Sequence, residues 1–189
     1  MTPTIRSLAN AFRLGALAAL LAACTTAGVP AGAPEELADQ GACLGKNPSA
    51  LAAATQGMPP YVGRDSYANV ALDAGTVLYS LTPGIAPGFA VSEATLRDTG
   101  GSWQEYYALV QVTTDPGRDA DGRPRKLREA VRAFHVTEPV CVARGTAMAN
   151  PQFGAGGGTQ YYVPPADAHK LRPGDIMPIS QWRIAISAE

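Results

Sequence analysis

The 189-residue sequence has few of the residues that mark several large classes of protein. It contains three cysteines and two histidines, and it has neither a CxxC nor an HExxH motif, so no zinc site is expected. It has 15 basic and 16 acidic residues. Without a basic excess, nucleic acid is not an expected partner. There is also no GxSxG nucleophile elbow and no P-loop motif. What is present is a hydrophobic fraction of 46%, enough for one ordinary domain with a core.

Long apolar runs are missing too, and the ten-residue run near the start is too short to span a bilayer as a helix. It follows a basic start without acidic residues and ends in Leu-Ala-Ala-Cys, which resembles a bacterial lipobox. We expect a signal peptide over 1–23, a flexible tether over 24–35 that starts at a lipidated Cys24, and one domain over 36–189. Because Thr25 rather than aspartate follows the cysteine, an outer-membrane anchor in the cell envelope is favoured over an inner-membrane one. The alternative is an ordinary secretory peptide.

Two cysteines, Cys43 and Cys141, remain for the mature domain. An exported domain meets an oxidising compartment, so we expect these two residues to form a disulfide. Because the bond would close a long loop, it would contribute about 3–5 kcal/mol to stability. The alternative is two separate buried thiols.

Short apolar segments bounded by glycine and proline predict short strands and short helices. The expected strands are residues 76–81, 106–113, 133–142, 159–163 and 182–187. The expected helices are residues 93–98, capped by Ser92, and residues 166–171, with one or two more within 35–54. Residues 115–125 have the composition of a polar turn. The sum predicts an α+β domain with a mostly antiparallel, curved sheet and short helices.

Residues 153–163, FGAGGGTQYYV, stand out from the rest of the sequence. Three consecutive glycines, Gly156, Gly157 and Gly158, each cost about 0.5–1 kcal/mol in chain entropy. They are favoured where the backbone approaches something closely, such as a ligand, or adopts positive φ; the alternative is a plain hairpin turn. A dinucleotide fold is excluded because the following residues cannot form the helix that its glycine motif must open. Gln160 then lies in a strand otherwise suited to burial, and its amide needs partners from the loop or from a ligand.

Residues 134–139 (FHVTEP), 150–154 (NPQFG) and 156–161 (GGGTQY) together resemble the C-terminal half of the tuberculosis necrotizing toxin (TNT) domains and related fungal surface NADases. The resemblance covers residues 132–179, about a quarter of the chain. Members of that family hydrolyse NAD+ to nicotinamide and ADP-ribose. Their compact α+β fold is related to ADP-ribosyltransferases. The resemblance therefore implies that fold for this domain and NAD+ as a substrate, with no other cofactor and no metal.

The resemblance also implies roles for individual residues. Gln160 takes the central polar role, orienting a ribose hydroxyl or the attacking water and facing the positive charge that develops on the sugar. Arg97, and less directly Arg132, would hold the pyrophosphate, because a guanidinium pairs well with phosphate oxygens. Taken alone, either arginine is more often a solvated surface cation. The remaining substrate-binding candidates are Tyr79 and Phe153, for stacking on a ring, and the loop glycines Gly156, Gly157 and Gly158.

Three functions stay open at this point. The first is a lipid-anchored NAD+ glycohydrolase related to toxins, acting on NAD+ outside its own cell. The second is a TNT-like module that binds a nucleotide without turnover, favoured by Ser80 at a position where many relatives have an arginine. The third is a structural envelope lipoprotein in which the glycine loop is only a turn. The expected partners are NAD+ and, through Cys24, the membrane, and a toxin-like domain also allows a protein inhibitor.

Overall fold

The computed structural model describes residues 40–81 and 87–186, with side chains as far as Trp182. The predicted signal peptide, Cys24 and the tether lie outside these residues. Within the described ranges, no helix has the length and hydropathy needed to cross a membrane.

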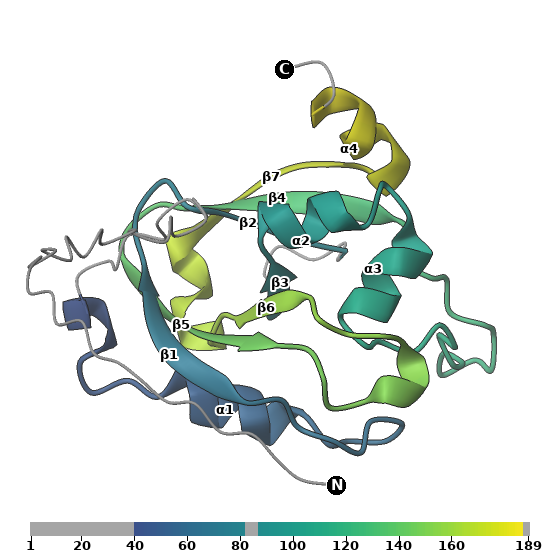
Figure 1. Ribbon diagram of the computed structural model, residues 1–189, viewed down its shortest axis with the longest axis horizontal. Coiled ribbons are helices and arrows are strands. Elements are labelled where there is room, and N and C mark those ends of the chain that lie inside the picture. The colour runs from purple at the N-terminus through teal and green to yellow at the C-terminus, as the bar shows by residue number, and fades with distance from the viewer. Residues whose placement is uncertain (1–39, 82–86, 187–189) are drawn as a thin grey trace, which may run out of the picture. The chain divides into compact units, whose positions relative to one another are not determined.

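Seven strands form one curved, fully antiparallel sheet, with the helices arranged around it (Figure 1). The strands lie side by side in the order β1-β5-β6-β3-β2-β4-β7. Their bounds are β1 (Tyr67–Leu72), β2 (Val77–Ser80), β3 (Phe89–Val91), β4 (Ala130–Val136), β5 (Val140–Thr146), β6 (Thr159–Tyr162) and β7 (Leu171–Pro178). The helices are η1 (Gln40–Cys43), α1 (Pro48–Thr55), α2 (Glu93–Asp98), α3 (Trp103–Leu109), η2 (Pro151–Phe153), η3 (Pro165–Lys170) and α4 (Ile179–Ile186). The predicted α+β fold with an antiparallel sheet is confirmed.

Several predicted elements are present where the local signals were strong. Strands β2 and β6 match two of the predictions, and α2 begins as expected at Ser92, whose hydroxyl accepts a hydrogen bond from the Thr95 amide. The predicted strand over 133–142 is two strands, β4 and β5, because Pro139 in the turn lacks the N–H that a continuous ladder requires. Strand β7, which was not predicted, contains Pro173 and lies at the sheet edge, where a missing N–H is tolerated.

Two predicted strands are helices instead. Residues 106–113 were expected to be a strand, but Trp103–Leu109 is α3, which begins at Ser102 with a hydroxyl that accepts from the Glu105 amide. Tyr106 and Val110 are four residues apart and both buried, as expected for one face of a helix. Residues 182–187 were expected to be a strand, but α4 extends to Ile186, and Trp182 and Ile179, three residues apart, are both buried. In both cases helical spacing and tertiary packing outweighed the β-propensity of aromatic and branched residues.

The core consists of two larger clusters and one smaller cluster of buried side chains. The first cluster packs strands of the sheet together and includes Leu78, Phe134 and Tyr161. The second packs α2, α3 and α4 against the sheet and includes Leu96 and Tyr107. A third, smaller cluster joins α1 to β5 and β6 through residues Ala52, Ala143 and Tyr162. The helices thus cover different parts of the sheet.

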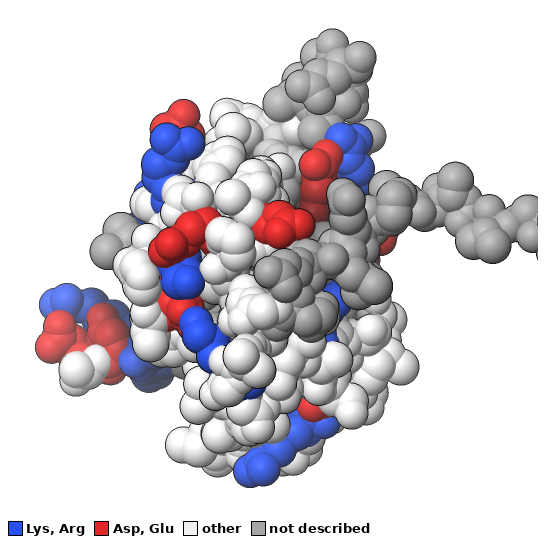
Figure 2. Space-filling model, turned by 90° about the vertical axis from the view of Figure 1, so that its left-hand side faces the viewer, with Lys and Arg blue, Asp and Glu red and all other residues white. Residues whose placement is uncertain are grey.

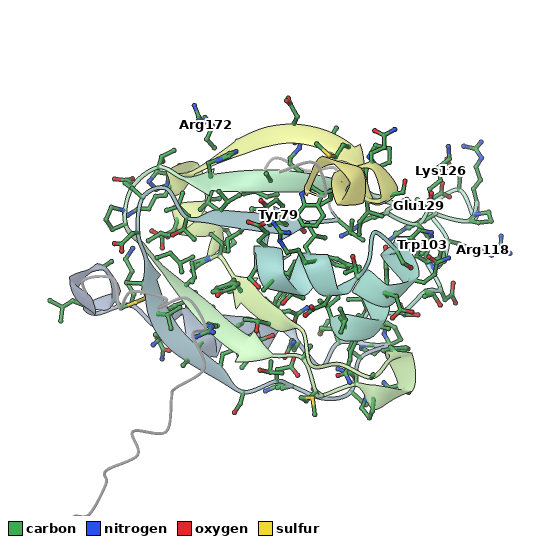
Figure 3. The ribbon with its side chains drawn as sticks, turned by 45° about the horizontal axis from the view of Figure 1, so that its top comes forward. Tyr79, Trp103, Arg118, Lys126, Glu129 and Arg172 are labelled. Atoms are coloured by element: carbon green, nitrogen blue, oxygen red, sulfur yellow. A yellow bond between two sulfur atoms is a disulfide. The ribbon has the colours of Figure 1, made fainter. Side chains whose placement is uncertain are left out.

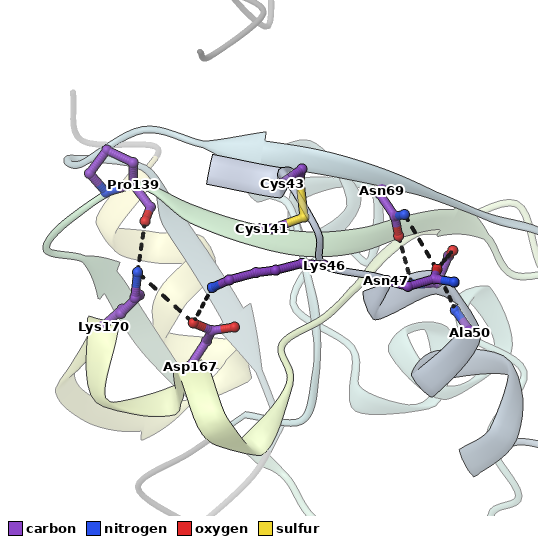
Figure 4. The surroundings of a disulfide bond; sticks show 10 residues. Cys43, Lys46, Asn47, Ala50, Asn69, Pro139, Cys141, Asp167 and Lys170 are labelled. Carbon is purple, nitrogen blue, oxygen red and sulfur yellow. Dashed lines mark hydrogen bonds and ion pairs between the residues drawn. A yellow bond between two sulfur atoms is a disulfide. The ribbon is translucent and has the colours of Figure 1, made fainter. Parts of the chain in front are cut away.

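The predicted disulfide is present and ties the N-terminal helices to the sheet (Figure 4). Cys43 in η1 and Cys141 in β5 have Cα atoms 4.9 Å apart and are separated by 98 residues. Next to the bond, Lys46 Nζ lies 2.8 Å from Asp167 Oδ1. Helix α1 then begins at Asn47, whose Oδ1 accepts from the Ala50 amide. The disulfide therefore fixes the position from which α1 starts.

Candidate functional site

A cavity of about 520 Å³ lies among the ends of several elements, within the size range of small-molecule sites. One wall is the segment after α1, with Gln56, Tyr61 and Asp65, and another is α3 and the residues that follow it. The ends of β2 and β3, Asn150 and Gln160 complete the polar lining. Its aromatic lining residues are Tyr61, Phe89, Tyr106 and Tyr107. The cavity thus combines flat aromatic surfaces with a few polar groups.

Gln160 lies in the cavity wall on β6 and is 6% exposed. Its Oε1 lies 3.5 Å from the Tyr67 hydroxyl, which donates to it, and its Nε2 donates to the Val110 carbonyl oxygen, also at 3.5 Å. Both contacts are at the long limit for hydrogen bonds. A buried amide held this weakly retains the capacity to bond to a ligand in the cavity.

Basic residues lie along one side of the cavity. Arg125, Lys126 and Arg128 line it from the segment between α3 and β4. Figure 3 labels Lys126 on this segment, with Arg118 nearby. On the face drawn in Figure 2, basic and acidic side chains alternate instead of gathering by sign. We call residues 125–128 the basic segment; it gives the cavity a positive side suited to phosphate groups.

The sequence prediction missed the basic segment, because residues 115–125 have the composition of a polar turn. A signal was available: five of the 15 basic residues fall within residues 118–128. Four acidic residues, Asp115, Asp119, Asp121 and Glu129, lie among or next to the five basic ones, so the net charge over residues 115–129 is only +1.

The predicted substrate residues lie on several different elements of the fold. Within the described part of the chain, Gln160 lines this cavity and the other predicted substrate residues do not. Arg97 lies on α2, where its Nε donates to Glu93 Oε1 at 2.9 Å, and Arg132 lies opposite Ser80 in the β2–β4 pair. Tyr79 packs edge-on against Trp182, with ring centroids 5.5 Å apart (Figure 3). Phe153 packs edge-on against Tyr61, a lining residue, with ring centroids 5.3 Å apart.

The glycine loop approaches its own chain closely. The amides of Gly156, Gly157 and Gly158 donate to the carbonyl oxygens of Ala108, Ala147 and Leu109 at 3.0, 2.8 and 3.1 Å. Gly156 and Gly157 have φ of 71° and 90°, in the region that favours glycine. A side chain at 156 would place its Cβ 2.2 Å from the Ala147 oxygen. The close approach expected from the sequence is thus made to the end of α3 and the end of β5, and it places Gln160 beside the cavity.

We expect Gly156→Ala to lower the free energy of unfolding by at least about 2 kcal/mol, since positive φ and the clash with the Ala147 oxygen both oppose a side chain. Gly157→Ala is the matched control, because its φ is also positive but its Cβ would meet open space. Gly157→Ala should lower the free energy of unfolding by about 1–2 kcal/mol, because only the cost of positive φ opposes its side chain. Urea unfolding of both variants measures the difference, and equal losses would contradict the close packing at Gly156.

Gln111 and Asn150 hold three cavity loops together, and neither was singled out in the sequence. Gln111 has φ of 52°, rare for a residue with a side chain, and it is 4% exposed. Its Oε1 accepts from the Asn150 amide at 2.7 Å, and its Nε2 donates to the Gly154 oxygen at 3.1 Å. Asn150 Oδ1 in turn accepts from the amides of Val62 and Gly63. These bonds give the wall a fixed shape.

Ser80, in the position where the sequence comparison noted an arginine in relatives, also lines the cavity. Its hydroxyl donates to the Phe89 oxygen at 3.0 Å, and Tyr106 is a further lining residue. Burial raises the pKa of Tyr106 above its usual value, so this hydroxyl stays protonated at neutral pH. This part of the wall is therefore uncharged.

The model of the Rhs1 C-terminal toxin domain matches residues 44–165 of this chain, which is more than half of its length. The chain belongs to the Rhs1 C-terminal toxin domain family. A solved structure, "Rhs1-CT in complex with cognate immunity protein RhsI1", is 30% identical, with a TM-score of 0.59 over 70% of this chain and 96% of that one. "Structure of Tse6 in complex with Tsi6" matches at 18% identity and a TM-score of 0.37, over 59% of this chain and 73% of that one, too distant to add support. No curated protein matches.

The toxin-domain match includes every described residue of the cavity, from Thr55 to Gln160. Strand β7 and helix α4 lie beyond it. The toxin-related part of the sequence prediction is thereby confirmed at the level of a family. This toxin domain carries its cavity within the part of the chain that defines the family.

Proposed function

We propose that this toxin domain is an NAD+ glycohydrolase that acts in the cavity around Gln160. The observation that carries the proposal is a buried amide with weak internal partners, set in the wall of a cavity that also has a basic side. The resemblance of residues 150–161 to NAD+-hydrolysing domains and the membership in a toxin family support the same reaction.

The proposed reaction breaks the bond between nicotinamide and ribose. Nicotinamide leaves as a neutral ring and takes the bonding electron pair, so positive charge develops on the sugar. The oxygen of a water molecule then bonds to the ribose carbon that nicotinamide has left. The water releases a proton, and the product is ADP-ribose. The Gln160 oxygen faces the developing charge, and its N–H orients a ribose hydroxyl or the water. Aromatic walls such as Tyr61 and Tyr106 provide flat surfaces for the rings.

The pyrophosphate of NAD+ is assigned here to the basic segment in place of Arg97 and Arg132, since Arg125, Lys126 and Arg128 line the cavity. Replacing Arg125 and Lys126 together by alanine should raise KM for NAD+ about tenfold and change kcat less, because contacts to phosphate bind substrate and transition state alike. Arg172→Ala, on the exposed part of β7, is the control (Figure 3). Steady-state kinetics measures both constants. A rise in KM on Arg97→Ala instead would return the phosphate to α2.

The proposal is tested by incubating the purified chain with NAD+ and separating the products by chromatography. Hydrolysis gives nicotinamide and ADP-ribose in equal amounts, whereas ribosyl transfer gives nicotinamide and a modified acceptor. If the chain releases no nicotinamide but melts at a higher temperature with NAD+, it is a module that binds the nucleotide without turnover. A chain with neither response is the structural protein.

A protein inhibitor is part of the proposal, because the relative Rhs1-CT was solved with its cognate immunity protein. The lipid anchor at Cys24, the membrane as a partner and the location in the cell envelope also remain proposed. They rest on the sequence pattern of residues 1–35, outside the described part of the structure.

A further inference from the structure

Tyr67 and Gln160 lie on the same rung of the sheet, with a glycine between them. In the strand register, Tyr67 of β1 is opposite Gly145 of β5, and Gly145 is opposite Gln160 of β6. A Cβ at position 145 would lie 2.7 Å from Cδ1 of the Tyr67 ring. Because the middle strand has no side chain there, the tyrosine can lean across it. This places its hydroxyl 3.5 Å from Gln160 Oε1.

The Tyr67 hydroxyl is held by two further side chains of the cavity wall. Gln56 Nε2 donates to it at 2.9 Å. Asp65 Oδ2 lies 3.3 Å from it, so Asp65 Oδ2 and Gln160 Oε1 are alternative acceptors of the single hydroxyl proton. Gln56 and Asp65 also bind each other: Gln56 Nε2 donates to Asp65 Oδ2 at 2.9 Å, and the Asp65 amide donates to Gln56 Oε1 at 2.7 Å. We call Gln56, Asp65 and Tyr67 the polar triad.

The triad is itself fixed to the fold. Asp65 Oδ1 accepts from the amides of Met148 and Ala149, both at 2.8 Å. Burial, together with the negative charge of Asp65, raises the pKa of Tyr67, so its hydroxyl remains a donor at neutral pH. All of these bonds converge on one hydroxyl next to the amide of Gln160.

We propose that Tyr67 is a positioning residue: Gln56 and Asp65 hold its hydroxyl, and that hydroxyl sets the orientation of the Gln160 amide for reaction. This inference rests on the proposed function. Asp65 supports the arrangement and is not a reacting group, because its two oxygens accept three hydrogen bonds from the protein without using the Tyr67 proton. With the hydroxyl in place, the amide oxygen of Gln160 points toward Tyr67 and its N–H toward Val110.

The first test is Tyr67→Phe, which keeps the ring and its packing against Phe89 and removes the hydroxyl. We expect kcat for nicotinamide release to fall about tenfold, while KM changes less than twofold, because substrate binding through the basic segment is untouched. Tyr162→Phe is the matched control: its ring packs on Phe89 in the same cluster, outside the triad, and its kcat should stay at the wild-type value.

The second test exchanges the acidic and amide side chains of the triad. Asp65→Asn turns an acceptor into a donor facing Gln56 Nε2, so kcat should fall as in Tyr67→Phe. The double variant Gln56→Glu with Asp65→Asn pairs every donor with an acceptor again. Its asparagine amide would donate to the new carboxylate and to the Tyr67 hydroxyl, which leaves the proton of that hydroxyl for Gln160 Oε1. Most of the lost kcat should return in the double variant, which a loss of stability alone would not predict.

The outcomes separate this inference from the function on which it rests. If the wild-type chain releases nicotinamide and Tyr67→Phe has the same kcat, the positioning role is overturned and the hydrolase function stands. The positioning role is also overturned if Tyr67→Phe and Asp65→Asn melt at a lower temperature with a raised KM and the double variant does not regain kcat. The triad would then be structural only. A wild-type chain without nicotinamide release overturns the function together with the inference.

Discussion

Gln160→Ala is expected to lower nicotinamide release by at least about 100-fold, the typical loss when one polar group that stabilises transition-state charge is removed. Gln160 is the side chain on which the cavity, the rung with Tyr67 and the glycine loop converge. Its two internal hydrogen bonds are long, so their loss should cost only about 1 kcal/mol of stability. Product chromatography gives the rate, and thermal melting gives the stability.

The matched control for this substitution is Gln104→Ala. Gln104 is an exposed glutamine on α3, where its Oε1 accepts from the Ser102 hydroxyl. The same change in side chain there should leave the rate unaltered. If Gln160→Ala released nicotinamide at the wild-type rate with unchanged melting, the reaction would have to occur elsewhere on the domain.

Loss of the disulfide should have the largest effect on stability. Cys43→Ser with Cys141→Ser is expected to lower the free energy of unfolding by about 3–5 kcal/mol, since a bond across 98 residues restricts the unfolded chain strongly. Urea unfolding at neutral pH measures the loss. Lys46→Ala is the control beside the bond: it removes an ion pair whose lysine is 39% exposed, at a cost of about 1 kcal/mol or less.

The disulfide has a consequence for the site as well. It fixes η1, from which the chain continues into α1 and ends that helix at Thr55, next to Gln56 of the polar triad. Nicotinamide release in the double serine variant should therefore fail at a lower temperature than in wild type. A loss of less than about 1 kcal/mol on removing the bond would contradict the chain-entropy explanation.

The sequence predicted those parts of the fold that local chemistry determines. Ser92 starts α2 because its side chain caps the helix, and the paired cysteines needed only an oxidising compartment and a suitable distance. Residues 106–113 were assigned wrongly because aromatic side chains favour strands by propensity, while burial in the tertiary structure selected the helical spacing. The capping serine at Ser92 was enough to predict α2, whereas the equivalent serine at Ser102 went unnoticed and α3 was assigned as a strand.

The candidate site was only partly predictable, because it is assembled by long-range pairing. Gln160 was found from the glycine loop before it. Tyr67 was not, because its closeness to Gln160 depends on the register of β1, β5 and β6 and on the absent side chain at Gly145. The basic segment was missed since acidic neighbours mask its charge. Arg97 was chosen because it lies near the position of a phosphate-facing arginine in the resembled family. The fold puts it on α2 beside Glu93, and its role stays a prediction.

The central claim is that the cavity between Gln160 and the basic segment holds NAD+. The most direct test is a crystal structure of the Gln160→Ala chain with NAD+, in which slow turnover should preserve the substrate. We predict the ribose attached to nicotinamide beside position 160 and the pyrophosphate within ion-pair distance of Arg125, Lys126 or Arg128. Nucleotide bound at Arg97, or a cavity left empty at saturating NAD+, would contradict the claim.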